Sequence, residues 1–425
     1  MTLLVFIVSL IGAMSLGVPV AFALIFCGVI LMSFMGMFNT QIIAQNMLIG
    51  ADTFTLLAIP FFILAGELMN AGGLSKRIIE FAITFVGHIR GGLGLVAIIA
   101  AVIMASISGS AAADTAALAA ILIPMMARAG YNVPRSAGLI AAGGVIAPVI
   151  PPSMAFIIFG VAANVSISQL FMAGIVPGLL MGLSLVITWM IVAGRDNVET
   201  LPRAPWTDRW QSIGRAAWAL GMPVIILGGI RMGVVTPTEA AVIAAFYALF
   251  VGMVVYRELK PRHLLGVLIA AGRTTAAIMF LVCAALVSAW LITAANIPNE
   301  IAGYIAPLIE NPKLLMLVIM LLILVVGTAL DLTPTILILT PVLMPIVIKA
   351  GIDPVYFGVM FIMNCCIGLL TPPVGVVLNV VSGVGRVPLG KVIRGVWPFL
   401  IAQILVILLL VAFPSIVIVP ARWFY

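Results

Sequence analysis

The chain has 425 residues, of which 64% are hydrophobic and 8% are charged, and its formal net charge is +7. An ordinary soluble domain has about 25% charged residues, so a soluble fold could not cover this much apolar surface. The lysines and arginines lie in short segments between long apolar runs, a pattern that orients membrane proteins and argues against binding to nucleic acid. The composition therefore predicts a polytopic membrane protein that is surrounded by membrane lipid.

Five membrane-spanning helices are expected in the first half of the chain. Apolar runs place them at about 2–15, 18–36, 54–71, 136–163 and 172–194. Inside a bilayer the backbone polar groups must be satisfied within the segment itself, so such runs should be helical. The first residues have no positive region, and no cleavage site of small residues follows, so we expect 2–15 to be a helix and not a removed signal peptide.

The apolar run at 91–127 is interrupted by polar residues at its centre. These are Ser106, Ser108, Gly109, Ser110 and Asp114. The run is too long for one crossing, and the charges of the flanking loops require both of its ends to lie on one side of the membrane. It is therefore predicted to be a re-entrant helical hairpin with a polar, non-helical tip. A carboxylate in apolar surroundings indicates a functional role for Asp114, with capping of the second hairpin helix as the alternative.

The helix expected at 136–163 is interrupted by three prolines and a serine, which are Pro148, Pro151, Pro152 and Ser153. Proline lacks a backbone N–H and clashes with the preceding helical turn, so this helix must be broken. Unwound backbone at membrane depth is tolerated where protein buries it or where it lines a cavity. The freed carbonyls and the nearby hydroxyl and carboxylate groups are oxygen ligands that suit sodium, and the exposed helix N-termini suit a carboxylate substrate.

The second half of the chain repeats the first. With a shift of 221 residues and no gaps, the matching positions are Pro124 and Pro345, Arg128 and Lys349, Gly130 and Gly351, Pro151-Pro152 and Pro372-Pro373, Gly174 and Gly395, and Pro177 and Pro398. The repeat predicts two halves, 1–200 and 216–425, joined by a cytoplasmic linker at 201–215. Helices are expected in the second half at about 216–231, 237–256, 264–292, 355–384 and 395–420.

The second half has its own hairpin and its own broken helix. The hairpin is expected at 314–350, with Gly327, Thr328, Asp331 and Thr333 at its tip. The expected partner of Asp331 is either a bound cation or the backbone N–H groups at the start of the next helix, which it would cap. A threonine followed by a proline is a good helix start, so Thr333 is predicted to cap the second hairpin helix. The helix at 355–384 is broken at Thr371, Pro372, Pro373 and Gly375.

The charges of the loops orient the two halves. Around the first hairpin the loops carry Lys76, Arg77, Arg90, Arg128 and Arg135 against the single Glu80, whereas the equivalent loops of the second half have no positive excess. Positive loops favour the cytoplasm, so the halves should cross the membrane in opposite directions. The expected fold is an all-α inverted-topology repeat with about five crossing helices and one re-entrant hairpin per half. Secondary transporters with this architecture bind their substrate near the membrane midplane, between the halves.

Four of these features together resemble the large membrane subunit of tripartite ATP-independent periplasmic (TRAP) transporters. They are the run at 57–69, the hairpin tip at 108–110 with Asp114, the break at 151–153 and the break at 371–375. The resemblance covers essentially the whole chain, and among TRAP permeases the sequence looks most like those for 2,3-diketo-L-gulonate. It implies a multi-pass protein of the bacterial inner membrane.

The resemblance also implies how such a protein works. A periplasmic binding protein delivers an organic acid, often a sugar acid, and a small four-helix membrane subunit completes the complex. A sodium gradient drives transport, with Na⁺ as the coupling ion and no other cofactor. The hairpins and broken helices carry the site past a fixed scaffold in an elevator movement. Carried onto this chain, the sodium and substrate ligands are expected at Ser106, Ser108, Gly109, Ser110, Asp114, Pro148, Pro151, Pro152, Ser153, Gly327, Thr328, Asp331, Thr333, Thr371, Pro372, Pro373 and Gly375.

Three other functions are compatible with parts of the pattern. A standalone ion-coupled anion symporter would need no partner subunit, and a passive channel would need no coupling ion. An intramembrane aspartyl protease could share a proton between Asp114 and Asp331, but the sequence before Asp331 lacks the Gly-x-Gly-Asp pattern of such enzymes. We therefore expect a transporter and not an enzyme. The four cysteines lie within apolar runs and only two histidines are present, so no transition-metal site is expected.

Overall fold

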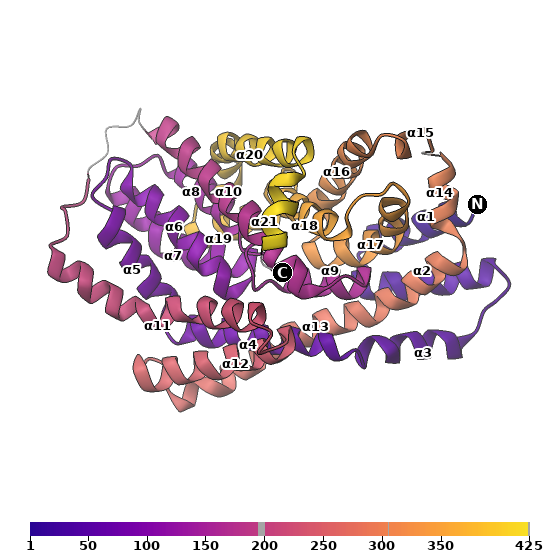
Figure 1. The fold of residues 1–425 in the computed structure, drawn as a ribbon, viewed down its shortest axis with the longest axis horizontal. Helices are drawn as coiled ribbons and strands as arrows, with labels where there is room; N and C mark the ends of the chain where they lie inside the picture. The colour runs from indigo at the N-terminus through magenta and orange to yellow at the C-terminus, as the bar shows by residue number, and fades with distance from the viewer. Residues whose placement is uncertain (194–199, 305, 424–425) are drawn as a thin grey trace.

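The computed structural model describes residues 1–193, 200–304 and 306–423, and within these ranges it consists of helices, turns and loops without a strand (Figure 1). Nine of the described helices are long and apolar enough to cross a membrane. The chain is therefore an all-α polytopic membrane protein, as its composition predicts.

The elements follow the two halves of the sequence. The first half forms α1 (Thr2–Ser15), α2 (Val20–Phe34), α3 (Thr40–Ala51), the 3-10 turn η1 (Phe54–Leu57), α4 (Ala58–Ala71), α5 (Leu74–Val86), α6 (Gly92–Ser108), α7 (Ala111–Arg128), α8 (Val133–Gly144), α9 (Met154–Ala163) and α10 (Ile167–Ala193). The second half forms α11 (Trp206–Arg231), α12 (Pro237–Phe250), the π-helical turn η2 (Val251–Val255), α13 (Pro261–Ala294), α14 (Ile297–Tyr304), α15 (Ala306–Ile309), α16 (Pro312–Ala329), α17 (Leu332–Lys349), α18 (Pro354–Leu370), α19 (Val376–Gly385), α20 (Leu389–Ala412) and α21 (Ser415–Trp423).

Each of the ten expected crossings corresponds to a helix or to a broken pair of helices, but two boundaries differ. The expected linker at 201–215 is helical from Trp206 onwards, because the start of α11 buries Arg209, Ser212 and Ala216 on one face and packs on α5. Residues 195–199, which also precede this helix, lie outside the described part of the chain. The last expected helix ends at Ala412, because Pro414 disfavours the helical conformation of the residue before it.

Four helices were not expected at all, α3, α5, α14 and α15. In α5 the residues Leu74, Ile78, Ile79 and Ala82 recur with the helical period and are buried. The opposite face of α5 carries charges, so its short apolar stripe did not look like a membrane span. It connects α4 to the first hairpin.

The repeat extends to the ends of the helices. A shift of 221 residues places both ends of α7 on the ends of α17, and the start of α8 on the start of α18. The same shift places the cis peptide bond Pro151-Pro152 on the cis peptide bond Pro372-Pro373. The halves also pack on each other in matching pairs, since α7 contacts α19 and α17 contacts α9. The opposite orientation of the two halves in a membrane stays a prediction.

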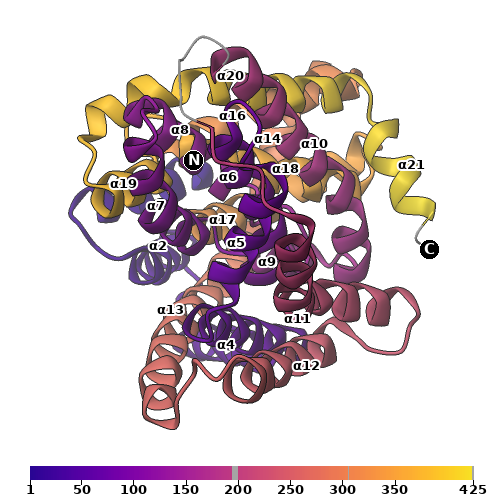
Figure 2. The same ribbon diagram turned by 90° about the vertical axis from the view of Figure 1, so that its left-hand side faces the viewer.

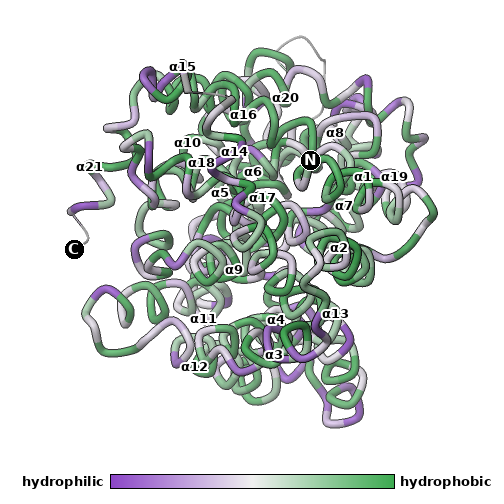
Figure 3. Tube along the Cα trace, turned by 90° about the vertical axis from the view of Figure 1, so that its right-hand side faces the viewer, coloured by the Kyte–Doolittle hydropathy of each residue, from purple (hydrophilic) through white to green (hydrophobic). Residues whose placement is uncertain are grey.

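Two groups of helices are distinct in space. The views agree that α4, α11, α12 and α13 lie together along one side of the molecule (Figures 1 and 2), with α3 beside them (Figures 1 and 3). This group is here called the scaffold layer. The other group, here called the hairpin body, contains α6–α10 and α16–α20. Most of the trace in both groups is apolar, and hydrophilic stretches are short (Figure 3). The hairpin body carries all of the residues expected to bind sodium or substrate.

Candidate functional site

The first hairpin has the expected polar, non-helical tip. Helix α6 ends at Ser108, and Gly109 turns the chain with a φ of +60°, in the left-handed region that favours glycine. Ser110 then caps α7, since its hydroxyl accepts a hydrogen bond of 3.4 Å from the Ala113 N–H. Ser106 lies one turn before the tip and donates to the Ile103 carbonyl at 2.6 Å. The tip therefore joins two helices that run back along each other.

Asp114 lies buried beneath this tip, with only 1% of its surface exposed. The Ser108 hydroxyl donates to its Oδ1 at 2.5 Å. Its Oδ2 has no hydrogen-bond partner among the described residues, and neither does the buried hydroxyl of Thr115 beside it. Because Ser110 is the cap of α7, the capping alternative for Asp114 is wrong. A buried carboxylate oxygen without a partner is costly, and a bound cation would remove that cost.

The first broken helix is interrupted where the prolines predict it. Helix α8 ends at Gly144, and α9 begins at Met154 after a non-helical segment that is buried throughout. The Ser153 hydroxyl donates to the Pro148 carbonyl at 2.5 Å and accepts from the Phe156 N–H at 3.5 Å. Ser153 therefore caps α9 and satisfies a carbonyl that the break has freed.

Hairpin tip and broken helix meet in the first half. A Cβ placed on Gly109 would lie 3.1 Å from the Pro152 carbonyl oxygen and 3.4 Å from the Ser153 Cα. A Cβ on Gly144 would lie 1.8 Å from the Thr115 hydroxyl oxygen. The structure thus brings together the two groups of candidate residues, 106–114 and 148–153. Sequence reasoning missed Thr115 and Gly144, although Thr115 follows the singled-out Asp114 directly.

The second hairpin tip is built differently from the expectation. Asp331, and not Thr333, caps α17, because its Oδ1 accepts a hydrogen bond of 2.8 Å from the Leu332 N–H. The cap prediction for Thr333 is wrong because the carboxylate of Asp331 satisfies the helix start two residues earlier. Pro334 then lies in the first turn, where its missing N–H costs nothing. Thr328 donates to the Val325 carbonyl of its own helix at 2.8 Å.

The second break also lies against its hairpin. Helix α18 ends at Leu370, where the Thr371 hydroxyl donates to the Ile367 carbonyl at 2.7 Å, and α19 begins after Gly375, which has a φ of +48°. A Cβ on Gly368 would lie 2.7 to 2.9 Å from backbone atoms of Gly327. Helices α16 and α18 therefore touch backbone to backbone just before the tip and the break.

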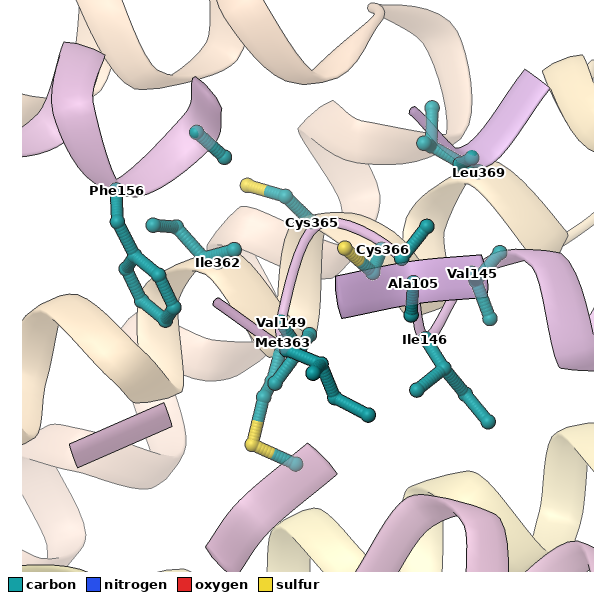
Figure 4. Packing of buried hydrophobic residues seen from close by; sticks show 14 of the residues in the cluster. Ala105, Val145, Ile146, Val149, Phe156, Ile362, Met363, Cys365, Cys366 and Leu369 are labelled. Carbon is teal, nitrogen blue, oxygen red and sulfur yellow. The ribbon is translucent and has the colours of Figure 1, made fainter. Parts of the chain in front are cut away.

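The two halves differ in burial. Asp114 and the segment 148–153 are buried, whereas Asp331 and Pro373 are exposed in this chain. Apolar side chains of α18, among them Cys365 and Cys366, gather with Ala105 of α6 and Val145 of the first break in the core (Figure 4). One core thus supports elements of both halves, while the second tip and break face outwards.

The arrangement of carboxylates does not match a proton-sharing pair. Asp114 accepts from Ser108, whereas Asp331 accepts from the Leu332 N–H. No group of three histidine, cysteine, aspartate or glutamate side chains that could hold a metal ion occurs in the described part of the chain. The side-chain atoms at the first tip that could bind a cation are oxygen atoms, which small hard cations prefer as ligands.

Comparisons with known proteins agree with the fold. The sequence matches the family model described as "Tripartite ATP-independent periplasmic transporter, DctM component" over residues 7–416. It is 55% identical over 423 residues to the 2,3-diketo-L-gulonate TRAP transporter large permease protein YiaN of Escherichia coli, with 100% of both chains covered. It is 41% identical over 404 residues to the sialic acid TRAP transporter large permease protein SiaM of Vibrio cholerae, with 95% of each chain covered.

A solved structure shares the fold. The Alcanivorax borkumensis YdaH transporter superposes with a TM-score of 0.64 over 87% of this chain and 86% of that chain, at 15% sequence identity. At this identity the likeness concerns the fold alone. The family match and the full-length relatives confirm the resemblance read from the hairpins and breaks. The chain therefore belongs to the DctM family of TRAP transporter large permease proteins, and it is a multi-pass protein of the bacterial inner membrane.

Proposed function

We propose that the chain is the permease subunit of a sodium-coupled TRAP transporter that imports an organic acid by an elevator movement. The observation that carries the sodium site is the buried Oδ2 of Asp114, which lacks a protein partner where a hairpin tip meets a broken helix. The Ser108 hydroxyl donates to the other oxygen of the same carboxyl group, and the next residue, Thr115, has a buried hydroxyl without a partner among the described residues. A sodium ion among these oxygens would compensate the charge that the membrane interior does not solvate.

The substrate class follows from the relatives and from the helix ends. The relatives named above are permeases for 2,3-diketo-L-gulonate and for sialic acid, both of which are sugar acids. Helices α9 and α19 begin at the two breaks, and the positive ends of their dipoles favour a carboxylate. We propose that the carboxylate of the substrate binds at these breaks, with the open second break as its point of entry.

The proposed partners are a periplasmic binding protein and a small four-helix membrane subunit. The family description names a tripartite system, so two other components are expected. The proposed movement is supported by the division into two groups of helices, since all candidate ligands lie in the hairpin body and none in the scaffold layer. A rigid displacement of the hairpin body would carry the site across the membrane.

Uptake into proteoliposomes tests the proposal. The purified permease, small subunit and binding protein are assayed with labelled 2,3-diketo-L-gulonate, sialic acid and a C4-dicarboxylate, with an inward sodium gradient or with choline in place of sodium. Uptake of one acid that needs both sodium and the binding protein is the expected result. Full uptake in a sodium-free proton gradient would refute sodium coupling. Uptake without the binding protein would favour a standalone symporter.

A further inference from the structure

One ion pair ties the connecting helix α5 to the scaffold layer. The Arg77 guanidinium lies 2.8 Å from a carboxylate oxygen of Glu258, which follows η2 in the turn between α12 and α13. The side chain of Arg77 is only 17% exposed, whereas that of Glu258 is 41% exposed. The same guanidinium stacks 3.8 Å from the centre of the Tyr256 ring. Arg77 is thus held by charge and by stacking at once.

The backbone beneath this pair is shaped to let the two turns meet. Gly73 has a φ of +75° and its carbonyl accepts from Arg77 Nη1 at 3.0 Å. A Cβ on Gly73 would lie 1.8 Å from Glu258 Oε2, and a Cβ on Gly72 would lie 3.0 Å from the Gly252 Cα. The positive φ of Gly73 favours glycine, and at Gly72 the backbones of the α4–α5 turn and of the turn between α12 and α13 lie close together.

Tyr256 connects the turn between α12 and α13 to helix α11. Its phenol donates to the Arg215 carbonyl of α11 at 2.6 Å, and burial raises the pKa of this phenol. These residues line a groove of about 540 Å³ between α5 and α11. The start of α5 is therefore connected to two helices of the scaffold layer.

The turn that follows α5 is connected to the hairpin body. The indole N–H of Trp189 in α10 donates to the Gly91 carbonyl at 2.8 Å, just before α6 begins. A Cβ on Gly94 would lie 2.0 Å from the Trp189 ring. The end of α5 itself also stays on the scaffold layer, since the hydroxyls of Thr84 in α5 and Ser212 in α11 lie 2.9 Å apart. The tie to the hairpin body therefore begins only in the turn between α5 and α6.

Helix α14, which is the counterpart of α5 in the second half, begins in a similar way but carries a negative charge where α5 carries a positive one. Asn296 precedes α14 with a φ of +56°, as Gly73 precedes α5. Glu300 occupies the place in α14 that Arg77 has in α5, and its carboxylate accepts from the Thr2 hydroxyl of α1 at 3.3 Å. A charged side chain one turn into the connecting helix thus makes a long-range contact in both halves.

We propose that Arg77 is a positioning residue for transport, which pins the start of α5 to the scaffold layer through Glu258 and Tyr256. The proposal rests on the elevator movement proposed above. With its start pinned, α5 cannot swing about Gly72 and Gly73, and displacement of the hairpin body must be taken up beyond the pinned end, towards the glycine-rich turn that precedes α6. Arg77 touches none of the candidate ligands, so it sets the rate of the movement and not the affinity of the site.

The test compares Arg77→Ala and Glu258→Gln with Lys76→Ala in the reconstituted complex. Lys76 is the matched control, because it lies on the same helix with the same charge, is 65% exposed and makes only a 3.9 Å pair with Glu80. Arg77→Ala and Glu258→Gln should lower the maximal uptake rate about tenfold, which is 1.36 kcal/mol in the barrier, without changing the half-saturating sodium or substrate concentration. Lys76→Ala should leave the rate unchanged.

The charge swap Arg77→Glu with Glu258→Arg separates positioning from folding. The swap should recover most of the rate that Arg77→Glu alone loses, and Arg77→Lys should be intermediate because it keeps the charge without the planar stacking. Hydrogen exchange of residues 72–80 should rise in the single variants and fall again in the swap. Wild-type uptake by Arg77→Ala, a shift in half-saturation at unchanged maximal rate, or no recovery in the swap would overturn the proposal. Uptake by the wild-type complex is measured in parallel with a sodium gradient and with a proton gradient. This control shows whether sodium coupling itself fails, independently of the role of Arg77.

Discussion

The Ser108 hydroxyl and the Asp114 carboxylate, six residues apart across the first hairpin tip, are joined by a hydrogen bond of 2.5 Å inside the protein. This bond fixes one carboxylate oxygen and leaves the other, which is buried, without a hydrogen-bond partner among the described residues. The tip thus leaves one oxygen of a buried carboxyl group free, which is the arrangement that a coupling ion would complete.

Asp114→Asn is expected to lower the apparent affinity for sodium. Asparagine keeps the size and can still accept from Ser108, but it removes the charge, so the loss should be about tenfold or more, as for other charge-assisted interactions of 1.4 kcal/mol and above. Uptake measured against sodium concentration checks this, with membrane expression as the control for folding. A wild-type sodium curve for Asp114→Asn would contradict a sodium site at the first tip.

Asp331→Asn tests whether the carboxylate at the second hairpin tip binds sodium or only caps α17. Asp331 is exposed and caps α17, and asparagine caps about as well as aspartate. If capping is its role, the variant should keep a wild-type sodium curve and wild-type expression. A sharp fall in sodium affinity would instead make Asp331 a ligand, as the sequence analysis expects. The same uptake assay decides between these two roles.

Single cysteines test the inverted orientation of the halves. Lys76 and Lys313 precede the first and the second hairpin, so Lys76→Cys and Lys313→Cys should react with a membrane-impermeant maleimide from opposite sides. The four native cysteines are buried, and their replacement by alanine or serine removes any background. Labelling of both positions from one side would remove the inverted repeat.

Gly395→Ala is expected to destabilise the fold. Helices α8 and α20 touch so closely that a Cβ on Gly395 would lie 2.0 Å from the Pro134 carbonyl oxygen, and backbone cannot move aside as a side chain can. The free energy of unfolding should fall by about 1–3 kcal/mol or more, which would be measured as a lower melting temperature in detergent. Gly390→Ala in the same helix is the control, since nothing lies within 4 Å of its Cβ. Equal melting temperatures of the two variants would contradict this packing.

Local chemistry made much of the fold predictable. The apolar runs place the crossings, and the prolines and glycines place both breaks, because a missing N–H or Cβ acts on the residues beside it. The repeat of 221 residues predicted from paired prolines coincides with the ends of α7 and α17. Helix caps were less predictable, since Asp331 caps α17 where Thr333 was expected, and Ser110 caps α7, for which Asp114 had been the alternative. Several side chains compete for each helix start, and small differences decide among them.

The sequence by itself determined that this is a membrane protein, which long apolar segments are helical, where two helices break, and which family it resembles. These properties depend on residues that are neighbours along the chain. Only the tertiary structure decided that Asp114 is buried and Asp331 exposed, that Gly109 lies against Pro152, and that Arg77 reaches Glu258. Such relationships join residues that are distant in sequence, and the packing of whole helices, which no local pattern encodes, sets the distance between them.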